Sequence, residues 1–167
     1  MLDRVPVARI LGFLFLATIV VLARITWDGY RVSSGGGAAP HIRFALFGIV
    51  VALFTHTMTL FYFVGTGSRI KKVVREYRLD EALYRRTLAF KSRLFPWLTF
   101  TPLITMAAFI LGGGAHTRIL PAWVHGGLAL AALAMNVVAA MVAIRCIGEN
   151  VALIDEIDGH LPEGAGD

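Results

Sequence analysis

Residues 42–65 read IRFALFGIVVALFTHTMTLFYFVG, an apolar stretch whose only Lys, Arg, Asp or Glu is Arg43 at its start. A helix needs about 20 apolar residues to cross the roughly 30 Å hydrocarbon core of a bilayer, so this length predicts a membrane span. Three similar stretches lie at residues 7–23, 94–111 and 121–147. The sequence therefore predicts an all-α integral membrane protein with four spans.

The composition fits a protein that lies mostly in lipid. Hydrophobic residues make up 57% of the 167 residues and charged residues 16%, and the mean hydropathy is +0.70. A soluble domain of this size would have too little polar surface to cover itself. Although the net charge is +5, basic residues beside membrane spans have a simpler explanation than nucleic acid, because they mark cytoplasmic loops. We therefore expect membrane lipids and other membrane subunits, or further copies of this chain, as partners.

The basic residues set the expected orientation. Nine of the sixteen Lys and Arg residues lie in residues 68–93, between the second and third spans, which places this loop in the cytoplasm. The loops at residues 24–41 and 112–120 contain only three Lys or Arg residues, Arg24, Arg31 and Arg118, and are therefore expected outside. The predicted fold is an antiparallel four-helix bundle in the inner membrane of a prokaryote, with both termini inside.

We predict a single domain over residues 1–158. It contains four spans, at about residues 7–25, 42–66, 94–112 and 121–148, and a basic amphipathic loop at residues 68–93. A disordered acidic tail at residues 159–167 is expected to follow this domain. The two halves of the chain resemble copies of one helical hairpin, since the spacing from Pro40 to Gly67 equals that from Pro121 to Gly148. Coincidence is the alternative, because glycines and prolines are common at the ends of membrane helices.

Prolines mark expected helix starts and one expected bend. Proline is tolerated in the first turn of a helix, which explains Pro40, Pro96 and Pro121. Pro102 falls inside the third span and removes one backbone hydrogen bond. It predicts a kink unless a neighbouring threonine hydroxyl supplies a substitute partner.

The cytoplasmic segments show helical patterns. Apolar residues at helical spacing continue the second span as an amphipathic helix, namely Ile70, Val73, Val74 and Tyr77. Asp80 is the expected N-cap of a second helix over residues 81–92. We expect these two basic amphipathic helices to lie on the anionic inner leaflet of the membrane. The acidic residues after Gly148 are expected in the cytoplasm, as is the basic loop. They either pair with the basic loop, within one chain or across two chains, or remain solvated.

His56 is the most informative single residue. It lies about 14 Å by helical rise from the inner end of its span, near the middle of the bilayer. An ionisable residue at this depth is by default a functional hypothesis, and the alternative is a neutral histidine bonded to a neighbouring helix. As an axial ligand of a b-type haem, His56 would need a partner at similar depth, for which Met106 and Met135 are the candidates.

Two other roles of histidine are open. His56 could join Tyr62, Thr105 and Asn136 in a polar proton or ion path, although the absence of Asp and Glu from the spans disfavours transport. Three more histidines lie near the outer surface and are candidate ligands for zinc or copper, namely His41, His116 and His125. The alternative is that each of these histidines lies at the membrane–water interface without binding a metal.

No catalytic motif occurs in the sequence. We therefore predict a non-catalytic membrane subunit, an anchor or accessory component of an electron-transfer complex, with His56 contacting haem b or a quinone. The alternative is a small homo-oligomeric channel or transporter in which His56 lies in a polar pathway.

Overall fold

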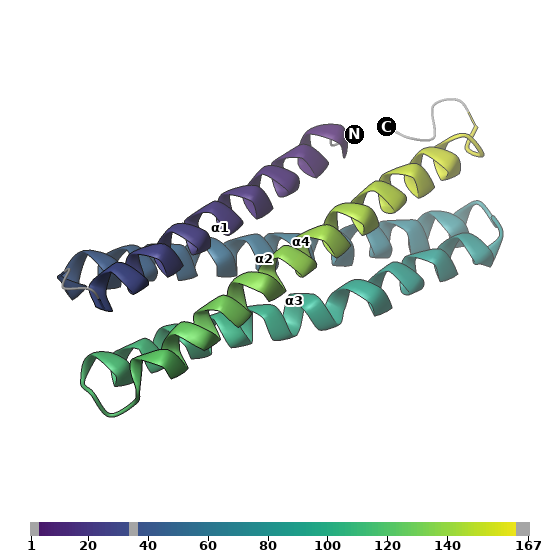
Figure 1. Ribbon diagram of the computed structural model, residues 1–167. Coiled ribbons are helices and arrows are strands. Elements are labelled where there is room, and N and C mark those ends of the chain that lie inside the picture. The colour runs from purple at the N-terminus through teal and green to yellow at the C-terminus, as the bar shows by residue number, and fades with distance from the viewer. Residues whose placement is uncertain (1–3, 34–36, 163–167) are drawn as a thin grey trace.

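The computed structural model describes residues 4–33 and 37–162, which form four helices and no strand. The helices are α1 (Arg4–Ser33), α2 (Ala38–Glu76), α3 (Glu81–His116) and α4 (Ala122–Asp158). Each is long and apolar enough to cross a membrane, which indicates a multi-pass membrane protein. Figure 1 shows them side by side in one elongated bundle.

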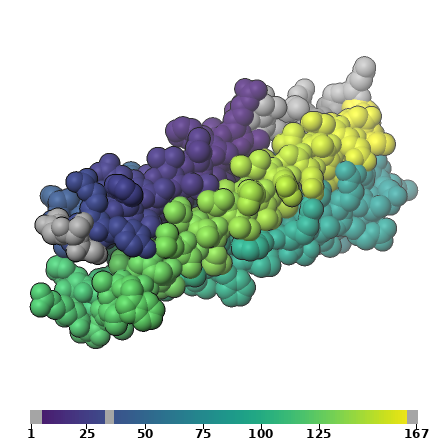
Figure 2. All heavy atoms as spheres, in the orientation of Figure 1, coloured from purple at the N-terminus to yellow at the C-terminus, as the bar shows by residue number. Residues whose placement is uncertain are grey.

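The helices pack as a ring of neighbours. α1 packs against α2 and α4, and α3 packs against the same two helices. α1 ends and α2 begins at one end of the bundle, where the turn after α3 also lies, and we call this the hairpin end (Figure 1). The turn that follows α2 lies at the opposite end, with the start of α1 and the end of α4, and we call this the terminal end. In the space-filling view, α4 lies between α1 and α3 on the visible face (Figure 2).

The outer surface is apolar on every helix. Large exposed hydrophobic side chains include Phe13, Leu16, Phe47, Phe54, Phe61, Phe100, Leu103, Leu130 and Ile144. An exposed apolar belt of this kind is unusual on a soluble monomer and suits contact with lipid chains.

Two helices end at an arginine in the left-handed conformation. Arg78 after α2 has φ 54° and Arg118 after α3 has φ 61°. In each case the next N–H bonds to a carbonyl oxygen five residues earlier, Leu79 to Val74 at 3.0 Å and Ile119 to Gly114 at 2.9 Å. This is the hydrogen bond of a Schellman motif, which normally has glycine at the left-handed position.

The predicted N-cap at Asp80 is confirmed, but the helix that it begins is longer than the predicted residues 81–92. Asp80 Oδ1 accepts from the Ala82 N–H at 2.8 Å and caps α3. The helix then continues past residue 92 through Pro96 and Pro102 to His116, so the prediction that Pro96 starts a helix is wrong. Thr99 and Thr105 bond to the carbonyl oxygens of Phe95 and Thr101, so neither hydroxyl replaces the bond that Pro102 removes.

The two amphipathic segments that the sequence predicts to be cytoplasmic pack into the bundle with their apolar faces. Ile70, Val74, Leu83 and Phe90 are buried in one core cluster with apolar residues of α4, including Leu153, Ile154 and Ile157. Their apolar faces therefore pack against α4, while contact of the basic side chains with anionic lipid stays a prediction. Burial against α4 explains why α2 and α3 extend so far.

The acidic end of α4 pairs with basic residues of α3 in the same chain. Arg86 bonds to Glu156 at 2.6 Å, and Arg93 bonds to Glu149. Of the arrangements open from the sequence, the structure shows pairing within one chain. α4 ends at Asp158, and residues 163–167 of the predicted acidic tail lie outside the described residues, as do Gly35 and Gly36 of the first predicted outer loop.

Candidate functional site

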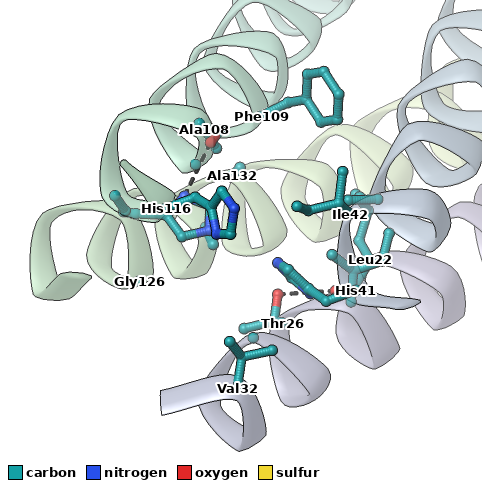
Figure 3. A pocket seen from close by; sticks show the side chains of 18 of the residues that line it. Leu22, Thr26, Val32, His41, Ile42, Ala108, Phe109, His116, Gly126 and Ala132 are labelled. Atoms are coloured by element: carbon teal, nitrogen blue, oxygen red, sulfur yellow. Dashed lines mark hydrogen bonds between the residues drawn. The ribbon is translucent and has the colours of Figure 1, made fainter. Parts of the chain in front are cut away.

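A cavity of about 390 Å³ lies inside the hairpin end, lined by residues from all four helices. Its walls are mostly apolar and include Leu22, Ile42, Ile49, Phe109, Ala132 and Leu133. Three histidines line the same space, His41 from α2, His116 from the end of α3 and His125 from α4, so we call it the histidine cavity. Figure 3 shows His41 and His116 on opposite sides of it. Its volume falls in the range of small-molecule sites.

The structure thus brings together the three histidines predicted near the outer surface. The rings of His41 and His125 have centroids 6.3 Å apart and an interplanar angle of 72°. His116 is the most exposed of the three. Among residues 4–33 and 37–162, however, no group of three or more His, Cys, Asp or Glu side chains is arranged to hold a metal ion. The metal site stays a prediction without geometric support.

Two glycines provide the space for the histidine rings. A Cβ atom on Gly29 of α1 would lie 3.2 Å from Cε1 of His41. A Cβ atom on Gly112 of α3 would lie 2.9 Å from Cε1 of His125, closer than real contacts allow. Each ring therefore packs on a glycine of the preceding helix, and this repeats in both hairpins. The glycines allow bulky rings to fit where two helices meet.

Hydrogen bonding assigns one ring nitrogen of His125. Its Nδ1 lies 3.0 Å from the carbonyl oxygen of Ala108, drawn as a dashed line in Figure 3. Because a carbonyl oxygen only accepts, Nδ1 must carry the hydrogen, and the neutral ring presents Nε2 as an acceptor. In His41 the buried Nδ1 has no hydrogen-bond partner among the described residues. The cavity thus contains imidazole groups able to donate and to accept.

A second polar cluster lies deeper in the bundle. It consists of six buried side chains from all four helices, which we call the polar layer: Thr18, Thr55, His56, Thr101, Thr105 and Asn136. The hydroxyls of Thr18 and Thr55 are 2.9 Å apart and join α1 to α2. Asn136 Nδ2 donates to Thr105 Oγ1 at 3.0 Å and joins α4 to α3. Thr105 also lines the histidine cavity, so the two features meet.

His56 is buried in this layer, with only 3% of its surface exposed. Its ring packs against Phe15 at a centroid distance of 5.7 Å, and neither ring nitrogen has a hydrogen-bond partner among the described residues. The structure does not gather the predicted haem ligands around a cavity. Met106 is 38% exposed and Met135 is half-buried, and neither methionine nor His56 lines either cavity described here.

The predicted polar path is divided into two parts. Thr105 and Asn136 belong to the polar layer. Tyr62 lies nearer the terminal end, where its hydroxyl accepts from Asn150 Nδ2 at 3.1 Å. A second cavity of about 380 Å³ lies beside Tyr62, between the start of α1 and the facing parts of α2 and α4.

Sequence reasoning missed Thr18, Thr101 and the two glycines that seat the rings. Thr18 follows Leu11 and Phe15 at helical spacing and so lies on the buried stripe of α1, which the sequence pattern could have shown. The glycines gave no comparable signal, because their role depends on which ring faces them. Comparison of the chain with protein-family models, with curated proteins and with solved structures finds no match.

Proposed function

We propose that the four helices cross the inner membrane of a prokaryote as an antiparallel bundle, with both termini and the α2–α3 turn in the cytoplasm. Two observations support this. The exposed surface of each helix carries large apolar side chains. The basic residues collect toward the terminal end of α2 and α3, as expected for the cytoplasmic side. The histidine cavity then lies near the outer face of the membrane.

Within that membrane, we propose that the chain is a non-catalytic subunit of an electron-transfer complex that binds a quinone-class molecule in the histidine cavity. The observation that carries this is the convergence of His41, His116 and His125 on one largely apolar space. The site differs from the His56 contact expected from the sequence, because His56 lines neither cavity.

The chemistry of the cavity suits a quinone ring. A quinone is flat and apolar and has two carbonyl oxygens that accept hydrogen bonds, whereas its reduced form has hydroxyls that donate. His41 has a buried ring nitrogen without a hydrogen-bond partner among the described residues, and His125 presents Nε2 as an acceptor. The same pair can therefore serve both redox forms, while Ile42, Ile49 and Phe109 contact the apolar ring.

The test is quinone binding by the purified chain in lipid nanodiscs, measured by tryptophan fluorescence quenching with a short-chain benzoquinone. Trp27 and Trp123, near the hairpin ends of α1 and α4, are the reporters. Loss of one ligand hydrogen bond costs about 1–1.5 kcal/mol, so His41→Ala and His125→Ala should each weaken binding about tenfold.

His160→Ala is the matched control, because His160 is exposed at the terminal end, where its ring Nδ1 lies 2.7 Å from the Glu156 carbonyl oxygen. It should bind as the unchanged chain does. No quenching by the quinone, or equal affinity in all four proteins, would show the assignment to be wrong.

A channel or transporter is the second candidate. The observation that favours it is a set of buried polar atoms, at His56, Thr101 and Asn136, that have no hydrogen-bond partner within residues 4–33 and 37–162. Proton or ion flux into proteoliposomes that is lost in His56→Leu would support this function. A Soret band in the purified protein, lost in His56→Ala, would instead support a haem subunit.

A further inference from the structure

Three side chains of the polar layer carry buried atoms without partners among the described residues. They are His56 (both ring nitrogens), Thr101 (Oγ1) and Asn136 (Oδ1), and each side chain is at least nine-tenths buried. Buried polar groups in native proteins are almost always hydrogen-bonded to protein or to ordered water. Three neighbouring exceptions therefore indicate a missing partner.

Contacts between neighbouring helices on all four sides of the bundle place these residues at one level. Gly67 of α2 faces Thr87 and Lys91 of α3, and a Cβ atom there would lie within 3.0 Å of both side chains. Moving eleven residues along each helix, toward the hairpin end, brings His56 level with residues 98–102 of α3. Thr101 is among these, so His56 and Thr101 occupy one cross-section.

The other helices close the same cross-section. The Thr18–Thr55 contact links α1 to α2 beside His56, and the Asn136–Thr105 bond links α4 to α3 one turn from Thr101. On the remaining side, a Cβ atom on Gly126 of α4 would lie 3.5 Å from the Tyr30 hydroxyl of α1. Moving twelve residues along α1 from Tyr30 and along α4 from Gly126, away from the hairpin end, brings Thr18 level with residue 138. This position is two residues from Asn136.

The donors and acceptors identify the missing partner. A neutral imidazole offers one donor and one acceptor, a threonine hydroxyl offers both, and an amide oxygen only accepts. The six residues of the layer include no Asp, Glu, Lys or Arg, so nothing in it compensates the charge of an ion. The inventory suits a small neutral molecule that both donates and accepts, which is water.

We propose that bound water molecules occupy the polar layer and connect the His56 ring to Thr101 and Asn136 at the middle of the bundle. The histidine cavity supplies a route for them, because Thr105 lies both in its wall and in the layer. His56 is then in contact with water although its surface is closed to the outside. This inference does not depend on quinone binding.

The test is water-edited solid-state NMR of the full chain in lipid bilayers, with ¹⁵N-labelled histidine. The His56 signals are assigned as those missing in His56→Leu. In the unchanged chain, magnetisation should pass from water to the His56 ring within milliseconds. The double variant Thr101→Val, Asn136→Leu removes the proposed partners and should reduce the transfer severalfold.

Thr66→Val is the matched control, because the Thr66 hydroxyl bonds to the Tyr62 carbonyl oxygen at 2.8 Å, away from the layer. It should leave the transfer unchanged. A His56 ring that receives no magnetisation from water in the unchanged chain, while exposed His160 does, overturns the proposal. So does equal transfer in the double variant. The transfer from water to the His56 ring in the unchanged chain tests the proposal even if the double variant does not fold.

Discussion

Gly112 lies beneath the His125 ring, and its lack of a side chain lets α3 and α4 approach there. In Gly112→Ala the new methyl group would sit 2.9 Å from a rigid ring and would displace it from the Ala108 carbonyl oxygen. We expect the free energy of unfolding to fall by about 1–3 kcal/mol, as for other overpacked sites. Thermal unfolding in detergent, followed by circular dichroism, measures this.

Gly113→Ala is the control for that change, because a Cβ atom on Gly113 meets nothing within 4 Å. Alanine is also the better helix former, by about 1 kcal/mol in soluble helices. The Gly113 variant should therefore match or exceed the stability of the unchanged chain. If Gly112→Ala and Gly113→Ala have the same free energy of unfolding, the His125 ring does not pack on Gly112.

Arg118 supplies a second prediction at the residue scale. Its left-handed φ of 61° strains any side chain with a Cβ atom, whereas glycine adopts it freely. Arg118→Gly should raise the free energy of unfolding by about 1 kcal/mol relative to Arg118→Ala, since both remove the charge and only one relieves the strain. Chemical denaturation of the two variants compares them directly. An alanine variant as stable as the glycine variant would contradict the Schellman assignment.

Among the elements, α3 and α4 are joined at the terminal end by Arg93–Glu149 and Arg86–Glu156. The side chains of Arg93 and Glu149 are 52% and 42% exposed, so water screens their attraction. A double-mutant cycle with Arg93→Ala and Glu149→Ala should give a coupling of about 0.2–1 kcal/mol, which falls as salt is added. A coupling of several kcal/mol, or one insensitive to salt, would refute this estimate.

The elements also show what could be predicted from the sequence. The four apolar stretches predict four helices, and Asp80 predicts the start of α3, because length and capping are local properties. The continuation of α3 through Pro96 was not predictable, because it depends on burial of Leu83 and Phe90 against α4. The gathering of three histidines likewise depends on how two hairpins meet, which local patterns do not specify.

At the scale of the whole molecule, the proposed orientation can be tested by cysteine labelling. Cys146 is the only cysteine and is buried, so Cys146→Ala gives a background without thiols. Glu76→Cys at the terminal end and Thr117→Cys at the hairpin end then place single exposed thiols at opposite ends of the bundle. A membrane-impermeant maleimide added to intact spheroplasts should label only the Thr117 variant, and disrupted membranes should allow both. Labelling of Glu76→Cys from outside would reverse the orientation.

The lengths of the helices have a practical consequence. α2, α3 and α4 contain 39, 36 and 37 residues, which by helical rise is about 54–58 Å, against a hydrocarbon thickness of about 30 Å. If the hairpin end lies at one lipid boundary, the turn at residues 77–80 stands well clear of the other. A fiducial protein inserted into that turn would be attached to α2 and α3, which pack against α4 at this end of the bundle. Such a marker would allow particle alignment in electron cryomicroscopy of a chain of only 18.2 kDa.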